Sequence, residues 1–314
     1  MIKIEATIPT GYGSTSTRSE VKMGKMPGGE LHPTIPPHLA CYPDYKLIAD
    51  TRSAEDIMAI LLTVDALRRQ CATKNPRVSL EIGYVPYARQ DRVCNPGESL
   101  SIAVFAGLIN SLNLDEVIIV DPHSDVTPAL INNVTIVTQT DVLKQTLIRE
   151  HCAIYYRDVA IDPKEWILVA PDAGAVKKTE ALVKEFGFKG IVYASKLREL
   201  STGKIVKTSL DRVVYDGTTQ PHESLADQKV LIVDDICDGG RTFLELAKVI
   251  QPYEPKQLDL FVTHGIFSQG QKELCKHFNR VMSSNTYRMD AITDFDNLEI
   301  NDLLALTEIR FPYL

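Results

Sequence analysis

The stretch that decides the fold is Val230-Leu-Ile-Val-Asp-Asp-Ile-Cys-Asp-Gly-Gly-Arg-Thr242. Its first four residues are apolar, which is typical of a buried parallel strand. Acidic residues and glycines come next, and an amphipathic segment at 243–250 follows and ends before Pro252. The order is therefore strand, glycine-containing turn and helix.

The turn has the chemistry of a site for a phosphorylated sugar. Gly239 and Gly240 let the backbone approach a ligand closely, and a helix start presents free N–H groups and a positive dipole end. The carboxylates of Asp234 and Asp235 can accept hydrogen bonds from two neighbouring sugar hydroxyls. The alternative is an ordinary strand-to-helix turn with acidic surface residues, but the order of apolar run, acidic pair, glycines and Thr242 favours the phosphosugar site.

This stretch resembles the loop for ribose 5-phosphate and phosphoribosyl pyrophosphate in the type I phosphoribosyltransferase fold. The resemblance implies a set of ribose-5-phosphate-binding residues: Asp234, Asp235, Asp238, Gly239, Gly240, Arg241 and Thr242. The motif alone leaves many enzymes open.

Length and composition limit the number of domains and the class of protein. A chain of 314 residues suggests two domains. The formal net charge of −7 argues against a nucleic-acid-binding surface. No apolar run is long enough to span a membrane, and acidic and polar residues interrupt any signal-peptide core at 1–5. The six cysteines are scattered without a Cys-x-x-Cys, so we expect reduced thiols in a cytoplasmic protein.

Apolar periodicity predicts alternating strands and helices. Strands are expected at 2–8, within 22–35 with a turn at 27–29, and at 78–85, 117–120, 166–170, 191–194, 230–233, 258–264 and 280–284. Helices are expected at 54–71, from a cap at Ser99 or Ser101 to 112, and at 141–150, 176–186 and 243–250, with a charged loop at 196–204.

These elements predict an α/β fold of two tandem phosphoribosyltransferase type I-like domains, each an open, mainly parallel sheet flanked by helices. The similar runs Val117-Ile-Ile-Val-Asp121 and Val230-Leu-Ile-Val-Asp234 favour a duplication, although two unrelated buried strands would look the same. We expect a nucleotide-binding domain at 1–145 and a ribose-5-phosphate-binding domain at 146–314, whose last residues could pack back on the first domain.

Three more motifs follow predicted strands, at the ends where open α/β sheets bind ligands. They are Tyr87-Ala-Arg-Gln-Asp-Arg92, Asp121-Pro-His-Ser124 and Pro171-Asp-Ala-Gly174. With the opening stretch, in this order, they resemble the ribose-phosphate pyrophosphokinase family from residue 29 to residue 265. The family transfers the pyrophosphoryl group of ATP to the 1-hydroxyl of ribose 5-phosphate, which gives 5-phosphoribosyl 1-pyrophosphate and AMP for nucleotide biosynthesis.

The resemblance assigns roles by position. It implies that ATP is bound by Glu30, Arg89, Gln90, Asp91 and His123. Arginine suits bidentate contacts to phosphate or to a base edge; the alternative for Arg89 and Arg92 is surface salt bridging.

The resemblance also implies a Mg²⁺ ion on His123 and Asp172 and a catalytic pair, Lys196 and Arg198, on a flexible loop that closes over the triphosphate. Few protein ligands are normal for Mg²⁺, whereas a lone histidine is more often structural or bound to a softer metal. A Lys-x-Arg loop could also be a solvated hairpin.

Two segments depart from the family pattern. Where relatives carry Phe-x-Asp-Gly-Glu, often from a neighbouring subunit, this chain has Met26-Pro-Gly-Gly-Glu30. Met26 can still pack on a base, but Gly28 offers no acid. The loop at 93–98 is short and lacks basic residues, so regulation by phosphate and ADP is not expected. The chain is similar to divergent, short-loop or viral members.

The family also implies a homo-oligomer built from dimers, with a hexamer as one form. Two alternatives remain: a phosphoribosyltransferase that consumes phosphoribosyl pyrophosphate, and a regulatory homologue without activity. The first would need only one catalytic domain. The second is disfavoured because Lys196, Arg198, His123 and Asp172 are all present.

Overall fold

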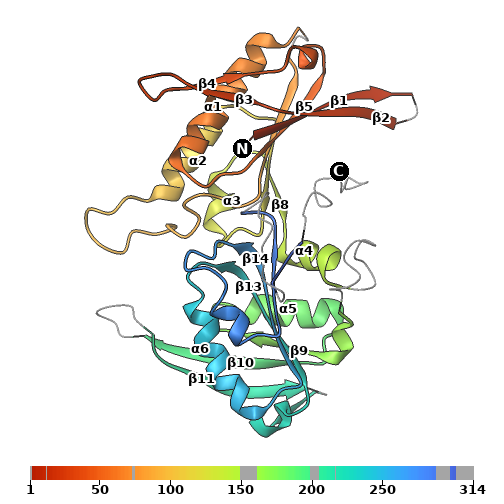
Figure 1. Ribbon diagram of the computed structural model, residues 1–314, viewed down its shortest axis with the longest axis vertical. Coiled ribbons are helices and arrows are strands. Elements are labelled where there is room, and N and C mark those ends of the chain that lie inside the picture. Colours follow the sequence, from red (N-terminus) through yellow and green to blue (C-terminus); the bar gives the residue numbers. More distant parts are fainter. Residues whose placement is uncertain are drawn as a thin grey trace. The chain divides into compact units, whose positions relative to one another are not determined.

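The computed structural model describes residues 2–11, 13–72, 75–148, 161–198, 205–215, 217–287 and 298–301. The chain divides into two compact units, Met1–Thr138 and Gln139–Leu314 (Figure 1). The expected boundary at 145/146 lies a few residues from this division, and the assignment of one substrate to each domain stays a prediction. The last residues, 302–314, lie outside the described part of the chain.

Unit 1 contains a six-stranded sheet in the order β2-β1-β5-β6-β7-β8. Its strands are β1 (Ile2–Thr10), β2 (Gly13–Glu20), β5 (Asp44–Ala49), β6 (Arg77–Ile82), β7 (Glu116–Val120) and β8 (Val134–Val137). The four strands from β5 to β8 are parallel, and β1 pairs antiparallel with both β2 and β5. A separate hairpin joins β3 (Lys22–Lys25) to β4 (Leu31–Thr34).

The helices of unit 1 are α1 (Ala54–Gln70), α2 (Ser101–Ser111) and α3 (Val126–Leu130). The connections from β5 through β8 all step to the next strand in the same direction, so right-handed crossovers place these helices on one face of the sheet. Buried residues of α1 and α2, such as Ile60 and Phe105, share one apolar cluster with Leu47 and Leu80 of the sheet. A capping box between Ser53 and Asp56 begins α1.

Unit 2 contains an eight-stranded sheet in the order β12-β11-β10-β9-β13-β14-β15-β16. Its strands are β9 (Trp166–Ala170), β10 (Gly190–Arg198), β11 (Ile205–Tyr215), β12 (Thr218–Gln220), β13 (Lys229–Cys237), β14 (Gln257–Gly265), β15 (Arg280–Ser284) and β16 (Leu298–Asn301). Its helices are α4 (Gln139–Thr146), α5 (Val176–Phe186) and α6 (Arg241–Ile250), with short 3-10 turns at 163–165, 222–225, 251–253 and 274–276.

The strand order of unit 2 creates a switch point between β9 and β13. The connection from β9 through α5 leads to β10 on one side, while the connection from β13 through α6 leads to β14 on the other. Right-handed crossovers in opposite directions place α5 and α6 on opposite faces of the sheet (Figure 1). Ligands of open α/β sheets bind in the crevice at such a point, outside the carboxyl ends of the strands.

The predicted α/β class with two open, mainly parallel sheets is confirmed. Most predicted strands and helices are present, and α5 has the predicted bounds because Gly187, at φ 69°, ends it in the left-handed conformation. The strands β2, β5, β8, β11, β12 and β16 were not predicted.

Three local predictions are wrong. A strand is predicted to end at Val233, the last residue of the apolar run. β13 instead continues to Cys237, because its pairing with β14 extends beyond the acidic pair. Lys196 and Arg198 were placed in a loop, but their backbone belongs to β10 and pairs with β11. Helix α2 begins after Leu100 without a side-chain cap, so neither Ser99 nor Ser101 caps it.

Candidate functional site

The acidic pair lies at the switch point of unit 2. Strands β9 and β13 are parallel neighbours, with Val169 opposite Ile232, so Asp172 lies just beyond the end of β9 near the pair. Burial raises the pKa of Asp234 to about 8, with further contributions from the negative charges of Asp235 and Asp172. The structure thus brings together three carboxylates whose mutual repulsion any cation or hydrogen-bond donor would relieve.

The acidic pair is held by its own backbone. Asp234 Oδ1 accepts a hydrogen bond from the backbone N–H of Asp235 at 2.9 Å, and Asp235 Oδ1 accepts one from Ile236 at 2.8 Å. Both carboxylates are partly exposed. Burial raises the pKa of the neighbouring Cys237 thiol to about 12, so this cysteine stays protonated and is not a nucleophile.

The glycine turn after β13 opens a helix toward the same edge. Gly240 is the N-cap of α6 with φ 76° and ψ −4°, and no side chain caps the helix. The first N–H groups of the helix, at Arg241 and Thr242, have no intrahelical acceptor and carry the positive end of the dipole. This part of the predicted site, Asp238 to Thr242, is therefore assembled at one helix start, as an anion-binding turn requires.

Asp172 shapes the turn between β9 and α5. Its Oδ1 accepts hydrogen bonds from the N–H groups of Gly174 at 3.1 Å and Ala175 at 3.2 Å. These bonds orient the carboxylate at the strand end. Carboxylate oxygens of Asp172, Asp234 and Asp235 are hard donors of the type that Mg²⁺ prefers. No group of three or more His, Cys, Asp or Glu side chains in the described ranges is arranged to hold a metal ion.

The residues of unit 1 that are predicted to bind ATP follow two neighbouring parallel strands. The turn that carries Arg89, Gln90 and Asp91 comes after β6, and His123 comes after β7, so both segments lie at one edge of the sheet. Arg89, Gln90 and His123 are exposed. The structure brings these residues to a common edge of unit 1.

Backbone strain marks this edge. Tyr87, at φ 64°, and Asp121, at φ 38°, both adopt the left-handed backbone conformation, which is uncommon for residues other than glycine. Asp121 is only 3% exposed, and its N–H donates to Val137 at 2.8 Å. Strained residues that packing holds in place are concentrated at functional sites, which favours a binding role for the edge.

Glu30 lies on the turn between β3 and β4. The turn is closed by hydrogen bonds of Met26 with Glu30 and of Gly29 with Met26, each at 2.8 Å. The hairpin is tied to the start of α1 by an ion pair between Lys25 and Glu55 at 3.0 Å. Met26 is 48% exposed and Glu30 is exposed, so both side chains are accessible to a ligand.

The remaining predicted residues are not described in full. The side chains of Lys196 and Arg198 lie outside what the structure describes, and their catalytic role stays a prediction. His123 belongs to unit 1 and Asp172 to unit 2, so their shared metal site also stays a prediction.

One polar cluster beside the site was not predicted from the sequence. His264 Nδ1 lies 2.7 Å from Thr286 Oγ1, which donates to the carbonyl of Thr263 at 2.8 Å. Ser284 Oγ is 2.9 Å from the same Thr286 oxygen. All four residues are buried, and His264 pairs with Ile236 next to the acidic pair. The run Thr263-His264-Gly265 at a strand end was the available signal.

Comparisons with known proteins cover both units. Residues 17–112 match the model of the N-terminal domain of ribose phosphate pyrophosphokinase, and residues 139–293 match the model of the phosphoribosyl transferase domain. The ribose-phosphate pyrophosphokinase of Mycoplasma pneumoniae is 26% identical over 260 residues, which are 81% of this chain and 72% of the relative. That of Pyrococcus furiosus is 26% identical over 275 residues, with 85% and 86% covered.

Among solved structures, the phosphoribosylpyrophosphate synthetase of Mycobacterium smegmatis has a TM-score of 0.70 and 22% identity, with 92% of this chain and 87% of that chain covered. The similarity establishes a common fold. None of the helices in the described part of the chain combines the length and apolarity needed to cross a membrane.

Proposed function

Because this chain belongs to the ribose-phosphate pyrophosphokinase family, we propose that it transfers the pyrophosphoryl group of ATP to the 1-hydroxyl of ribose 5-phosphate. The products are 5-phosphoribosyl 1-pyrophosphate and AMP. The observation that carries the proposal is the acidic pair followed by an uncapped helix start at the switch point of unit 2, in a chain whose first unit matches the N-terminal domain of these kinases.

Ribose 5-phosphate is recognised by the strand-to-helix turn of unit 2. The 5-phosphate accepts hydrogen bonds from the N–H groups at the start of α6, within Asp238 to Thr242. The 2- and 3-hydroxyls donate to Asp234 and Asp235. Because the pKa of Asp234 is raised by burial and by like charges, donors from a bound diol stabilise its ionised form and lower that pKa again.

ATP is recognised at the edge of unit 1 by Glu30, Arg89, Gln90, Asp91 and His123. The arginine offers a planar pair of donors for phosphate. A Mg²⁺ ion held by His123 and Asp172 would neutralise phosphate charge and orient the triphosphate for in-line attack. The exposed Met26 beside Glu30 offers an apolar surface to the base.

Lys196 and Arg198 stabilise the charge that develops on the transferred group. Their backbone lies at the end of β10, beyond Tyr193, which is the last β10 residue that pairs with β9. Strand ends place side chains more reproducibly than an isolated loop does. Removing one such donor costs about 10²–10³ in rate.

The test is to incubate the purified protein with ATP, ribose 5-phosphate and MgCl₂ and to measure AMP and phosphoribosyl pyrophosphate. Lys196→Ala should lower kcat about 10²–10³-fold with ATP affinity within a few-fold. Lys272→Ala, an exposed lysine elsewhere in unit 2, is the matched control and should behave as wild type. Absence of AMP, with consumption of phosphoribosyl pyrophosphate when a nucleobase is supplied, would instead identify a phosphoribosyltransferase. Inactivity in both assays would identify a regulatory homologue.

We also propose a homo-oligomer in a reducing, cytoplasmic compartment. The five cysteines in the described ranges are all free, which is the usual state in a reducing compartment. The family pattern supports a dimer-based assembly. Light scattering coupled to gel filtration measures the mass directly, and a monomer at micromolar concentration would contradict the oligomer.

A further inference from the structure

The connection after β14 runs along residues 238–242, which we call the anion-binding turn. We call residues 266–270 the flanking segment. The N–H groups of Ile266 and Phe267 both donate to the carbonyl of Cys237, at 2.9 and 3.0 Å, and the N–H of Ser268 donates to the carbonyl of Asp238 at 3.1 Å. The flanking segment is thus hydrogen-bonded to the beginning of the turn that is proposed to hold ribose 5-phosphate.

Packing holds the flanking segment in this position. Phe267 is 3% exposed and belongs to the same apolar cluster as Phe243 of α6. Its backbone has φ 48°, a conformation that is uncommon for a bulky side chain and persists only where surrounding contacts impose it. Ser268 and Gln269 follow this strained residue directly in the chain.

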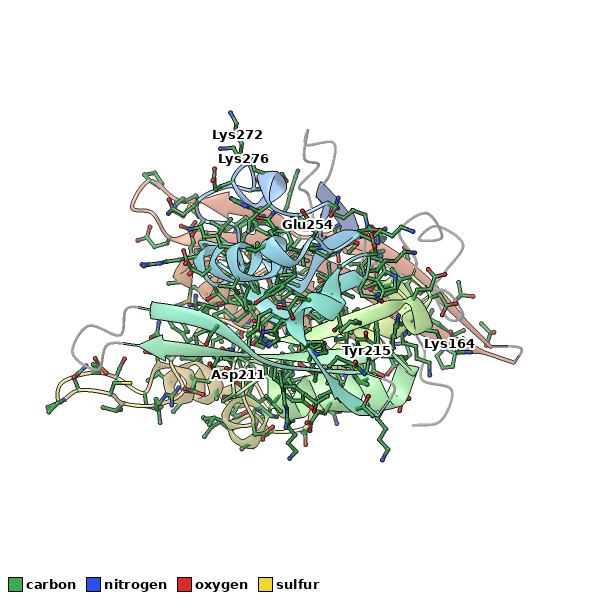
Figure 2. All side chains as sticks on the ribbon, turned by 90° about the horizontal axis from the view of Figure 1, so that it is seen from below. Lys164, Asp211, Tyr215, Glu254, Lys272 and Lys276 are labelled. Carbon is green, nitrogen blue, oxygen red and sulfur yellow. The ribbon has the colours of Figure 1, made fainter. Side chains whose placement is uncertain are left out.

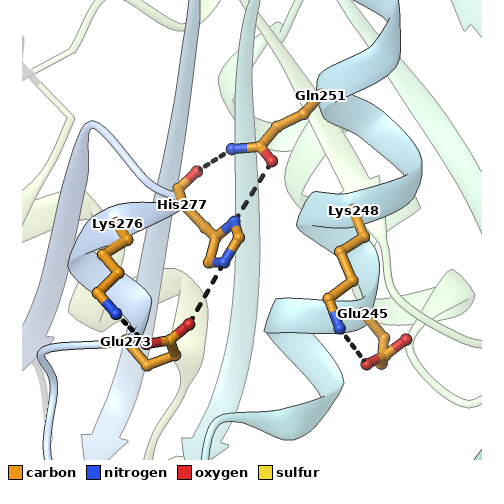
Figure 3. A network of polar contacts seen from close by, with 6 residues as sticks. All are labelled: Glu245, Lys248, Gln251, Glu273, Lys276 and His277. Carbon is orange, nitrogen blue, oxygen red and sulfur yellow. Dashed lines mark hydrogen bonds and ion pairs between the residues drawn. The ribbon is translucent and has the colours of Figure 1, made fainter.

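The far end of the same connection is also attached to α6. Gln251, just after the helix, donates to the carbonyl of His277 at 2.9 Å, and its amide oxygen lies 3.3 Å from the His277 ring (Figure 3). Leu274 packs against the α-carbon of Gly240, where an added Cβ would lie 3.2 Å from the leucine side chain. The connection is therefore fixed relative to the helix start at several points.

Ser268 and Gln269 lie beside the bare backbone of Gly239. A Cβ at Gly239 would lie 3.5 Å from Gln269 Cγ and 3.9 Å from Ser268 Oγ. Both side chains are exposed. Within the described residues, neither the Ser268 hydroxyl nor the Gln269 carboxamide makes a hydrogen bond to the protein, so both groups are accessible to a ligand.

Charge favours neutral donors that supplement Arg241 and Thr242 of the turn. Three carboxylates lie at the start of the turn or just before it, those of Asp234, Asp235 and Asp238. Their negative charges repel a phosphate dianion. Gly239 and Gly240 contribute no side chain at all. A hydroxyl and a carboxamide are neutral donors, so they can contact the phosphate without a competing ion pair to the aspartates.

We propose that Ser268 and Gln269 donate hydrogen bonds to the 5-phosphate of ribose 5-phosphate and complete its site from the flanking segment. The inference rests on the proposed function for the identity of the ligand. It adds two substrate-binding residues, carried by a different part of the chain, to the strand-to-helix turn.

The test compares Ser268→Ala, Gln269→Ala and the double variant with wild type. Each single change should raise KM for ribose 5-phosphate about ten-fold or more, because hydrogen bonds to charged groups are stronger than neutral ones. KM for ATP should stay within about two-fold, since the changed groups do not reach the nucleotide. Lys272→Ala is the matched control on the same connection, because its side chain extends away from the sheet into solvent (Figure 2).

A conservative variant makes the test specific for the phosphate. Ser268→Thr retains a hydroxyl at the same position, so it should keep most of the affinity for ribose 5-phosphate that Ser268→Ala loses. Calorimetry with ribose 5-phosphate and with ribose gives a readout without turnover: the single alanine variants should weaken only the phosphorylated sugar.

The outcomes separate this inference from the proposed function. Failure of wild type to make AMP would overturn the proposed function, whereas the calorimetric comparison would still test the phosphate contacts. Active wild type with unchanged ribose 5-phosphate affinity in the double variant would overturn the inference alone. An equal loss for ribose and ribose 5-phosphate in a folded variant would also overturn it.

Discussion

Replacing Gly240 by alanine tests whether the helix start that forms the anion-binding turn depends on glycine. Gly240 has φ 76°, and an alanine in the left-handed conformation costs about 1–2 kcal/mol. The new Cβ would lie 3.2–3.3 Å from Leu274 side-chain atoms, and a leucine that is 2% exposed cannot turn into solvent. This crowding adds about 1 kcal/mol, the low end of overpacking costs.

The unfolded state offsets part of this loss. Alanine has fewer unfolded conformations than glycine, which returns about 0.4–1 kcal/mol. The expected net loss for Gly240→Ala is therefore about 1–3 kcal/mol in the free energy of unfolding. It should appear as a lower urea midpoint with an unchanged m value, together with a higher KM for ribose 5-phosphate because the start of α6 is displaced.

Gly239→Ala is the matched control. Its φ is not positive, and the nearest atom to its Cβ is Gln269 Cγ at 3.5 Å, an ordinary contact. The control should be as stable as wild type or more stable by about 0.4–1 kcal/mol. Equal stability of Gly240→Ala and wild type, or equal losses in both variants, would refute the assignment of the strain to Gly240.

Three further predictions concern regulation, an ion pair and pH. Glu98 accepts hydrogen bonds from the N–H groups of its own loop, such as Cys94 at 2.9 Å, and the loop has no basic residue, so inorganic phosphate should not activate; a sigmoidal phosphate dependence would contradict this. Asp259 is fully buried 2.7 Å from Arg280, so Asp259→Ala should lose about 3–5 kcal/mol by urea unfolding, and far less when both residues become leucine. Burial raises the pKa of Glu81, so the native state retains its proton longer than the unfolded state, and stability from this group falls as pH rises above the ordinary glutamate pKa. The stability gain of Glu81→Gln should therefore grow from about pH 4 to neutral pH, and a constant difference would contradict it.

Local patterns in the sequence were sufficient for the elements that carry their own signals. The helix at 176–186 has apolar periodicity, and Gly187 directly after it adopts the left-handed conformation that ends a helix. Both of its bounds were therefore predictable. The run at 230–233 followed by acids and glycines predicted a strand, a turn and a helix in the right order. Both signals depend on neighbouring residues, which is why they could be recognised without the fold.

Pairing partners distant in the sequence decided what those patterns could not. β13 continues through the acidic pair to Cys237 because β14 lies alongside it, and the backbone of Lys196 joins β10 because β11 is there to pair with it. A strand end is set by hydrogen bonds to its neighbour, and no local pattern contains that neighbour.

The sequence by itself determined which residues have the chemistry of a phosphosugar site, because residue type and order suffice for that. Only the tertiary structure decided how these residues influence one another. The pKa of Asp234 is raised in part by Asp172, which arrives from β9, and Ser268 comes beside Gly239 because the connection after β14 returns to the turn. Electrostatic and packing effects depend on distance in space, and the strand order that sets those distances emerges only when the whole sheet is assembled.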